Sequence, residues 1–295
     1  MKVAILGAGT MGSVYARNLS AMPDVRLVGV CDVRQDAAET VARLGETKAY
    51  TAFDELMTTE DPEVVCVCLP TYLHKPYVLQ LAERGKHVIC EKPIALSLED
   101  AAEMEEACRK AGVRLFVGHV LRFFPNYYDL YDKVRSGIVG KVKVAHAQRF
   151  SSYPIGWEGW FANPEKSGGV ILDLMIHDLD FLRWTMGEVE SVYAMTHRAP
   201  GMEVAYVTLR FFGGALANVE AYWGYPGPFK TSVELACDNG VLRYDSEASR
   251  SLEIVRNQAG PADKPRVAVP QSPAHRDPYY YEIRHFLDCI REERE

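Results

Sequence analysis

The chain has 295 residues, of which 48% are hydrophobic and 25% are charged, as in most soluble globular proteins. Its formal net charge is −7, its sequence pI is about 5.7, and it contains no dense run of Lys or Arg. This balance argues against nucleic acid or an anionic membrane surface as a partner, and the length fits one large domain or two of typical size.

The cysteines and the N-terminus bear on the cellular compartment. Seven cysteines without a CxxC pair are typical of reduced thiols rather than of a disulfide framework. Cys66 and Cys68 alternate along an apolar run, but no His or Cys motif follows them, so we expect core residues there and no metal site. The first residues enter a strand without signal-peptide architecture, and no apolar stretch has the length of a membrane span. We therefore expect a cytoplasmic protein.

Residues 1–121 alternate short apolar runs with helical stretches. The predicted strands are Val3–Leu6, Leu27–Cys31, Val64–Leu69, His87–Cys90 and Leu115–Val117. The predicted helices lie near Gly12–Ala21, Asp36–Leu44, Lys75–Arg84 and Leu98–Ala111. This alternation predicts an α/β domain with a parallel sheet that helices cover on both faces.

Residues 122–295 follow a different pattern. Helices are expected near Asn126–Arg135, near Gly169–Met186 and from Tyr279 onward, with a polar, proline-rich loop over Gln258–Pro278. The predicted strands are Lys141–Phe150, Ser191–His197, Val204–Phe212, Ala215–Trp223, Ser232–Cys237, Val241–Tyr244 and Leu252–Val255. Gly213-Gly214 and Asp238-Asn239-Gly240 are hairpin signals, so we expect an α+β domain with an open, mostly antiparallel sheet.

A glycine-rich turn follows the first strand and predicts a dinucleotide site. Gly7 permits the turn, Gly9 lets the backbone approach a pyrophosphate, and Gly12 allows close helix–strand packing, with Thr10 and Met11 between them at the helix N-terminus.

The residues after the next strand bear on cofactor choice. Asp32, 20 residues beyond Gly12, would accept hydrogen bonds from the adenosine ribose and so favour NAD over NADP. Arg34 would partly offset this preference, so NADP stays possible.

The carboxyl ends of later strands should border the same cofactor. Pro70 and Thr71 follow the strand that ends near Leu69, and His74 is either a helix-start residue or a direct cofactor contact. Glu91 and Lys92 end the strand that begins at His87, and the proline that follows restricts Lys92 to extended conformations. By itself this segment would be no more than a charged turn.

A narrow polar stripe marks the predicted helix near Gly169–Met186. At α-helical spacing Asp173, His177, Asp180 and Trp184 share one arc, while most other positions are apolar. Asp173 and His177 either pair with each other at i, i+4 or line a cavity. The glycines at 168 and 169 favour the cavity.

These motifs resemble those of the glucose–fructose oxidoreductase/inositol dehydrogenase (Gfo/Idh/MocA) family. The resemblance covers nearly the whole chain in family order and rests on Gly7–Gly12, Glu91-Lys92-Pro93, Phe116–Phe123, Ser167–Asp180 and Tyr281–Phe286. It implies a Rossmann domain, a sheet domain through which subunits form homodimers or homotetramers, and NAD(P)-dependent oxidation or reduction at hydroxyl-bearing carbons of sugars, inositols or related polyols. Many members of the family continue further, so the chain ends earlier than this resemblance leads us to expect.

The resemblance also implies roles for individual residues. Lys92 would bind and polarise the reacting oxygen, His177 would be the general acid/base, and Asp173 would orient the imidazole or bind substrate. The candidate substrate contacts are His119, Arg122, Arg149, Tyr153, Trp157, Trp160 and Asn163. Two alternatives stay open: an NAD-retaining glycosidase of the same fold, and a non-catalytic dinucleotide sensor, which would need none of the three catalytic residues.

Overall fold

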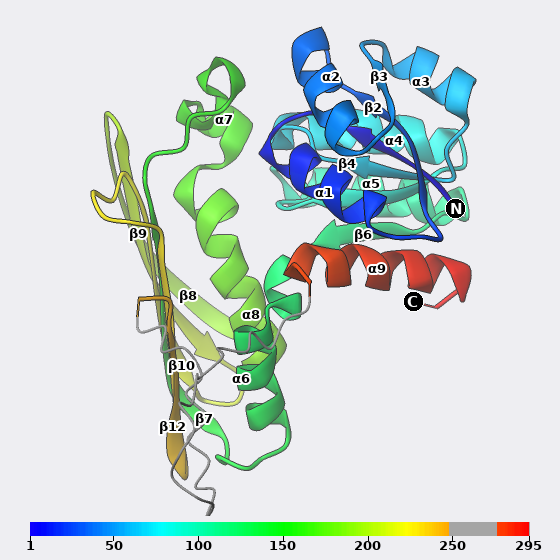
Figure 1. Ribbon diagram of the computed structural model, residues 1–295. Coiled ribbons are helices and arrows are strands. Elements are labelled where there is room, and N and C mark those ends of the chain that lie inside the picture. The colour runs from blue at the N-terminus through cyan, green and yellow to red at the C-terminus, as the bar shows by residue number, and fades with distance from the viewer. Residues whose placement is uncertain (248–275, 295) are drawn as a thin grey trace, which may run out of the picture.

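The computed structural model describes residues 1–247 and 276–294. It contains two six-stranded sheets, one at each side of the molecule in Figure 1, with helices between them and around the first sheet. The predicted strand Leu252–Val255 and most of the predicted loop Gln258–Pro278 lie outside the described residues.

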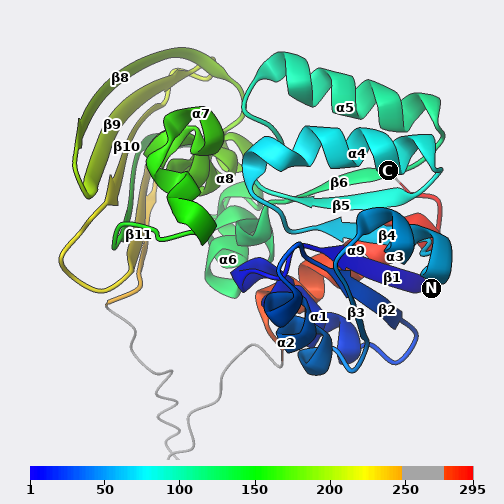
Figure 2. The ribbon, with the colours of Figure 1, turned by 90° about the horizontal axis from the view of Figure 1, so that it is seen from above.

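The first sheet is parallel throughout and has the order β3-β2-β1-β4-β5-β6. Its strands are β1 (Lys2–Leu6), β2 (Arg26–Cys31), β3 (Lys48–Tyr50), β4 (Val64–Val67), β5 (His87–Glu91) and β6 (Leu115–Gly118). The connecting helices are α1 (Thr10–Ser20), α2 (Gln35–Leu44), α3 (Phe53–Glu60), α4 (His74–Glu83) and α5 (Leu98–Lys110), with the single turn η1 (Thr71–Leu73) before α4. They cover both faces of the sheet (Figure 2), so the predicted Rossmann domain is confirmed.

The sequence prediction omitted β3 and α3. β3 has only three residues, two of them exposed, at the edge of the sheet, so no apolar run marks it.

The second sheet has the order β12-β11-β7-β10-β9-β8 and is antiparallel except for the β7–β10 pair. Its strands are β7 (Val142–Ser151), β8 (Val189–Ala199), β9 (Met202–Phe211), β10 (Leu216–Trp223), β11 (Lys230–Cys237) and β12 (Gly240–Asp245). The helical segments of this half are η2 (Val120–Phe123), α6 (Pro125–Arg135), η3 (Trp157–Ala162), α7 (Pro164–Ser167), η4 (Ile171–Met175) and α8 (Ile176–Met186). Both predicted hairpins are present, and α6 and α8 lie on the side of the sheet that faces the first domain (Figure 1).

The last helix, α9 (Pro278–Arg291), returns to the first domain. Its buried Ile283, Phe286 and Leu287 join the core that also contains residues of β1 and α1. Although the division at residue 121 assigns α9 to the second half of the chain, this helix packs as part of the first domain.

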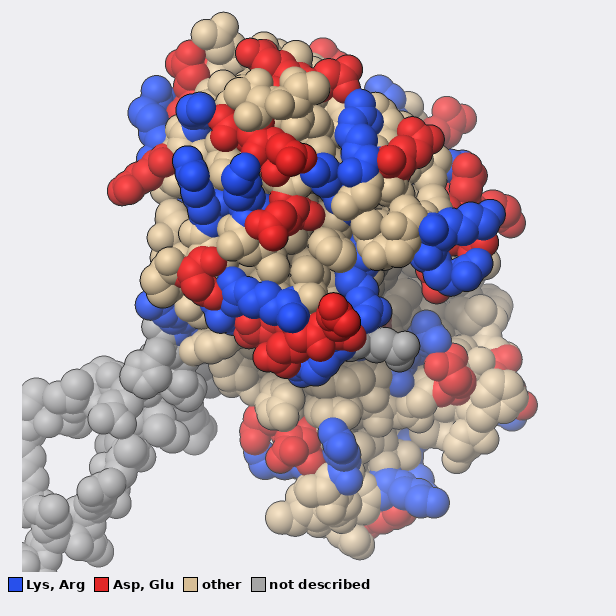
Figure 3. Space-filling view, turned by 90° about the vertical axis from the view of Figure 1, so that its right-hand side faces the viewer, with Lys and Arg blue, Asp and Glu red and all other residues tan. Residues whose placement is uncertain are grey.

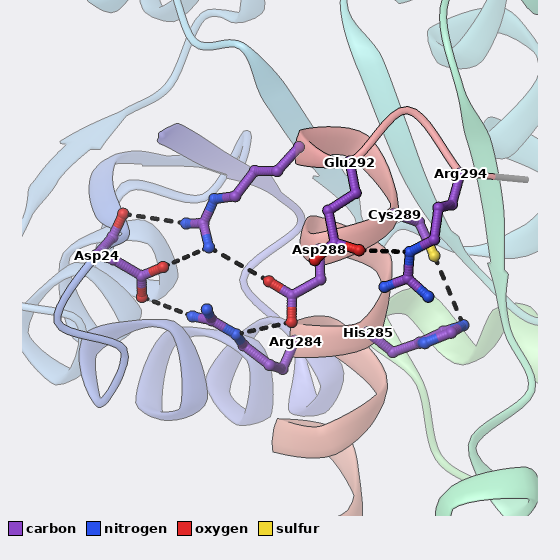
Figure 4. Close-up of polar contacts among 8 residues, drawn as sticks. Asp24, Arg284, His285, Asp288, Cys289, Glu292 and Arg294 are labelled. Atoms are coloured by element: carbon purple, nitrogen blue, oxygen red, sulfur yellow. Dashed lines mark hydrogen bonds and ion pairs between the residues drawn. The ribbon is translucent and has the colours of Figure 1, made fainter.

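Ion pairs attach α9 to the turn before β2 (Figure 4). Asp24 accepts a hydrogen bond of 2.6 Å from Arg284 and also pairs with Arg291, and both arginines contact Asp288 on their own helix. These groups are partly exposed, so each pair stabilises the fold by no more than about 1 kcal/mol. The buried apolar face of α9 is therefore the larger contribution.

Charges of both signs are interspersed over the face of the molecule that carries α9 and the first domain (Figure 3). On this face the described residues form no basic patch of the kind that binds nucleic acid. Among residues 1–247 and 276–294, no helix is long and apolar enough to cross a membrane.

Candidate active site

A cavity of about 820 Å³ lies at the carboxyl ends of the parallel strands, where ligands bind in doubly wound sheets. One wall comes from the first domain and includes the glycine turn, Asp32, the loop after β4, Glu91 and Lys92. The other wall comes from residues 155–161 around η3 and from Asp173 and His177. The predicted catalytic residues and most of the predicted cofactor residues therefore face one space.

The glycine turn has the shape that a pyrophosphate requires. A Cβ atom at Gly7, whose φ is +97°, would lie 2.4 Å from the Cys68 carbonyl oxygen, and one at Gly12 would lie 2.0 Å from the Gly7 carbonyl oxygen. At Gly9 nothing lies within 4 Å, so the space in front of α1 is open. No side chain in the described part of the chain caps this helix, which leaves its first N–H groups for a ligand. These residues fit the phosphates of a dinucleotide.

The Asp32 carboxylate, at the end of β2, is held by three groups. It accepts hydrogen bonds from the Ala8 N–H at 2.8 Å and from the Arg34 backbone N–H and guanidinium, each at 3.0 Å. Burial raises the pKa of Asp32, but the hydrogen bonds from Arg34 and Ala8 outweigh it and hold the pKa below its ordinary value. The carboxylate is thus ionised at neutral pH, as an acceptor for ribose hydroxyls must be.

Trp157 contacts the same end of the cavity. Its ring lies under the Arg34 guanidinium, 5.6 Å from centroid to Cζ. In the order of the sheet, β2 is three positions from β5, which carries Lys92 at its end. Trp157 therefore lies near the end of the cavity that carries Asp32 and Arg34, not beside the predicted catalytic residues.

Lys92 and Asp173 are in direct contact. The Lys92 ammonium donates to the Asp173 carbonyl oxygen at 2.7 Å and to its carboxylate at 3.1 Å, and both side chains are mostly buried, with 17% and 14% exposed. An ammonium has three donors, so one is left for a substrate oxygen. This contact joins the two signatures that the sequence presented separately.

The helix that carries Asp173 is not a regular α-helix. Residues 171–175 form the π-helical turn η4, and α8 begins only at Ile176. The expected polar arc, which assumed α-helical spacing throughout, is therefore wrong in detail: Asp173 and His177 line the cavity, whereas Asp180 and Trp184 do not. Within the described residues, Asp173 makes no hydrogen bond to His177, so of the two alternatives the structure has the favoured one, in which both residues line the cavity. Such π turns are frequent at functional sites.

His177 has the environment of a neutral base. Its Nδ1 atom is buried and has no hydrogen-bond partner among the described residues. Burial, together with the charges of Lys92 and Arg149, lowers the pKa of His177 well below its ordinary value of 6.5. The imidazole is therefore uncharged at neutral pH and can accept a proton.

His74 and His119 lie behind the cavity wall. The buried His74 ring lies between two carbonyl oxygens, with Nδ1 2.9 Å from Pro93 O and Nε2 2.8 Å from Leu69 O, and so connects the loops that carry the cofactor candidates. His119 lies 3.8 Å from the Asp180 carboxylate, and burial lowers its pKa. Neither ring is among the described cavity-lining residues.

Two arginines among the predicted substrate contacts form ion pairs within the protein. Arg122 makes a two-point contact with Asp180 at 2.6 and 2.9 Å. Arg149, only 4% exposed, binds Asp178 at 2.7 and 2.9 Å and donates to the Tyr127 hydroxyl at 3.1 Å.

Of the remaining predicted substrate contacts, two are engaged within the protein and one lines the cavity. Tyr153 packs on Trp223, and Asn163 caps α7 by accepting a hydrogen bond from the Glu165 N–H at 2.9 Å. Trp160, stacked on Phe161 at 3.9 Å, lines the cavity. Of the seven candidates, only Trp157 and Trp160 line the cavity within the described residues.

Tyr279 is a cavity residue that the sequence did not indicate. It comes from the first turn of α9 and reaches the cavity beside Glu91 only because that helix docks on the first domain. No local pattern could have placed it there.

The fold and the cavity together define a dinucleotide-dependent oxidoreductase whose second domain contributes the other wall of the cavity. Residues 1–119 match the model of the oxidoreductase family with an NAD-binding Rossmann fold, and residues 127–243 match the GFO/IDH/MocA C-terminal domain. The chain belongs to the Gfo/Idh/MocA oxidoreductase family, and its cofactor is NAD.

Relatives of known name cover nearly all of the chain. Myo-inositol 2-dehydrogenase of Thermotoga maritima is 31% identical over 99% of this chain and 88% of its own length. The 2,7-anhydro-N-acetylneuraminate hydratase of Mediterraneibacter gnavus is 34% identical over 90% of this chain and 75% of its own. Among solved structures, GenD2 from gentamicin A biosynthesis, in complex with NAD, superposes with a TM-score of 0.87 at 25% identity, covering 100% of this chain and 87% of its own.

Proposed function

We propose that this protein transfers a hydride between NAD and a hydroxyl-bearing carbon of a sugar, an inositol or a related polyol. The observation that carries the proposal is the placement of Lys92, Asp173 and His177 around one cavity with the glycine turn and Asp32. The dehydrogenase relatives of the chain support the same substrate class.

Lys92 holds the reacting oxygen in this proposal. Its ammonium is positioned by two bonds to Asp173, and its third donor binds the substrate hydroxyl. As the hydroxyl loses its proton, the fixed positive charge stabilises the negative charge that develops on oxygen. Asp173 keeps the ammonium in place and is a positioning residue for it.

His177 takes the hydroxyl proton. Because Nδ1 is buried, Nε2 is the nitrogen left for the cavity. The lowered pKa keeps the ring neutral and ready to accept at neutral pH, and in the reverse direction the ring returns the proton. When bound, the nicotinamide cofactor accepts or supplies the hydride.

The cofactor contacts follow the wall of the cavity. Gly7, Gly9, Thr10, Met11 and Gly12 take the pyrophosphate, and Asp32 takes the adenosine ribose, which favours NAD over NADP. Arg34 and Trp157 enclose the adenosine side, which their mutual contact supports. Pro70, Thr71, Glu91 and Lys92 border the nicotinamide half, and His74 supports their loops from behind.

Trp160 is the substrate contact that we retain among the aromatic candidates. It lies on the same cavity wall as Asp173 and His177, and an aromatic face suits the C–H face of a sugar ring. The other five candidates act indirectly, by stabilising the helices, strands and loops with which they are in contact: His119, Arg122, Arg149, Tyr153 and Asn163.

A screen of polyols, inositols and sugars for NADH formation tests the proposal. Reduction of NAD by at least one of these compounds is expected, and the rate should collapse in the Lys92 and His177 variants described below. Tight NAD binding without turnover of any member would instead favour a dinucleotide sensor.

The hydratase relative favours one second candidate: a reaction in which NAD stays bound and is regenerated in each cycle. The same three residues would serve a transient oxidation that labilises a neighbouring bond, as in the NAD-retaining glycosidase alternative. Conversion of a glycoside or anhydro-sugar without net NADH would identify this reaction.

We also propose a cytoplasmic homodimer or homotetramer that forms through the second sheet. On the face of that sheet away from α8, Tyr193, Met195, Tyr206 and Leu216 are 65%, 55%, 49% and 40% exposed. An apolar patch of this kind typically marks a protein interface. All seven cysteines are free, which suits a reducing compartment.

A further inference from the structure

A set of buried acidic and phenolic groups lies where β5, α1 and α9 meet. Glu91, at the end of β5, is 5% exposed and lines the cavity, whereas Glu282 on α9 and Tyr15 on α1 are fully buried. Among the described residues, the Tyr15 hydroxyl, Glu91 Oε1 and both carboxyl oxygens of Glu282 have no hydrogen-bond partner. The mechanism proposed above gives none of these atoms a task.

The free oxygens of Glu91 and Tyr15 converge on one point. A Cβ atom at Gly118 would lie 3.3 Å from Glu91 Oε1 and 3.4 Å from the Tyr15 hydroxyl. The other oxygen of Glu91 accepts the Lys92 backbone N–H at 3.2 Å, while the Lys92 ammonium is directed to Asp173. Glu91 thus lies beside the catalytic lysine without forming an ion pair with it.

The surroundings of Glu91 disfavour its ionised form. The titratable or charged groups that face Glu91 come from five elements. They are Tyr15 on α1, Cys66 on β4 with Cys68 just after it, Cys90 on β5 with Lys92 just after it, Asp173 on η4, and Tyr279 and Glu282 on α9. Burial raises the pKa of Glu91 to about 7, although the charge of Lys92, the neighbouring Tyr15 hydroxyl and the Lys92 backbone N–H oppose the shift. Burial, and then the charge of Glu91, raises the pKa of Glu282 well above its ordinary value.

The nicotinamide ring differs in charge between its two oxidation states: the oxidised ring is a cation and the reduced ring is neutral. Glu91 and Tyr279 line the part of the cavity that the proposed function assigns to the nicotinamide half, and the inference rests on that assignment. A cation in this poorly hydrated place favours the Glu91 carboxylate, whereas a neutral ring favours the acid.

We propose that Glu91 links proton binding to the oxidation state of the cofactor. Glu91 releases its proton to the solvent when oxidised cofactor binds, and it keeps the proton when reduced cofactor binds. Only the carboxyl O–H bond breaks in this step, the proton passes to the buffer, and no electron moves. During turnover Glu91 recovers a proton as the ring loses its charge, so the net charge of this part of the site stays constant.

Calorimetric titration of the purified protein with NAD+ and with NADH tests the link. With a free-enzyme pKa of about 7, the Kd for NAD+ should fall about tenfold between pH 6 and pH 8, while the Kd for NADH changes much less. Titrations in two buffers of different ionisation enthalpy should show proton release with NAD+ only. This wild-type measurement needs no variant, so it remains decisive even if a variant fails to fold.

Two isosteric variants test whether Glu91 is the group that releases the proton. Glu91→Gln should make the NAD+ affinity independent of pH in this range. Glu282→Gln is the matched control, because it removes a carboxyl from the same buried set that does not line the cavity, and it should keep the full pH dependence. Circular dichroism checks that both variants fold.

The outcomes separate the inference from the proposed function. Equal pH dependence for NAD+ and NADH in the wild type, an unchanged dependence in Glu91→Gln, or its loss in Glu282→Gln would each overturn the link while leaving the dehydrogenase assignment intact. If neither cofactor binds the wild type, the proposed function fails and the link fails with it.

Discussion

The ammonium of Lys92 lies 2.7 Å from the carbonyl oxygen of Asp173, a residue 81 positions further along the chain. The bond runs from the end of a strand in the first domain to a π turn in the second. A shift of either domain would therefore change the position of the charge that is to meet the substrate oxygen.

Lys92→Met removes that charge and keeps most of the apolar stem. Loss of one group that stabilises a developing oxyanion typically costs about 10²–10³ in kcat, and we expect a loss of this size. Binding of NAD should change less than about threefold, because the pyrophosphate contacts remain. Lys75→Met is the control, since Lys75 pairs with Asp100 and Glu103 outside the cavity. Normal turnover of Lys92→Met would remove this residue from the mechanism.

The acid side of the pH profile of kcat, measured with NAD and substrate both saturating, should report His177. Oxidation of the substrate needs the neutral imidazole of His177, so activity is present above the pKa of His177 and is lost as the pH falls through that pKa. Because burial and nearby cations lower that pKa, the loss should begin well below pH 6.5. His177→Gln should reduce kcat by about 10²–10⁴ and abolish this limb. A limb at or above pH 6.5 that survives in the variant would contradict the assignment.

Asp32→Ala should alter the choice of cofactor. The variant loses the ribose acceptor and also releases Arg34, which the carboxylate now holds by two side-chain bonds of 3.0 Å. Affinity for NAD should fall about tenfold or more, whereas affinity for NADP should fall less because the freed guanidinium can meet the 2′-phosphate. Adding Arg34→Ala should remove that advantage. Equal losses for both cofactors in Asp32→Ala would argue against the ribose role.

Arg149→Met should lower stability rather than substrate affinity. It leaves the fully buried Asp178 carboxylate without its cation, which typically costs about 3–5 kcal/mol in the free energy of unfolding. Arg243→Met breaks the exposed pair with Glu234 and should cost less than about 1 kcal/mol. Adding Asp178→Leu to Arg149→Met should restore part of the loss. Denaturant unfolding measures all four proteins, and a raised KM at unchanged stability would return Arg149 to the substrate contacts.

Met195→Glu tests the proposed subunit interface. The substitution places a charge in the apolar patch on the outer face of β8 and β9, so it should shift the protein toward smaller species in light scattering. Val241→Glu changes an exposed apolar residue on β12, at the opposite edge of the sheet, and serves as the control. An unchanged mass for Met195→Glu would place the interface elsewhere.

Most of the first domain could be predicted from local sequence, because buried parallel strands are apolar runs and the glycine turn has a steric requirement at each position. A Cβ atom at Gly7 or Gly12 would lie only 2.4 or 2.0 Å from a main-chain oxygen, so only glycine fits at either position. This steric requirement produces a recognisable spacing in the sequence. β3 left no comparable pattern, since it is short and mostly exposed at the edge of the sheet.

The site was predictable only in part, because its geometry depends on tertiary contacts. Lys92 and Asp173 could be selected by type and motif, but the π turn that alters the helical spacing has no periodic signature. Arg149 seemed available to a substrate until the fold placed Asp178 beside it. Tyr279 reaches the cavity from the far end of the chain, which no local pattern reveals.

The docking of α9 has a consequence for biosynthesis. Ile283, Phe286 and Leu287 complete the core around β1 and α1, yet the ribosome adds them after every residue of the second sheet. N-terminal domains commonly fold while the rest of the chain is still being made. Here the nucleotide-binding half cannot complete its core, and keeps part of its apolar surface uncovered, until residues 283–287 have been made and have left the ribosome.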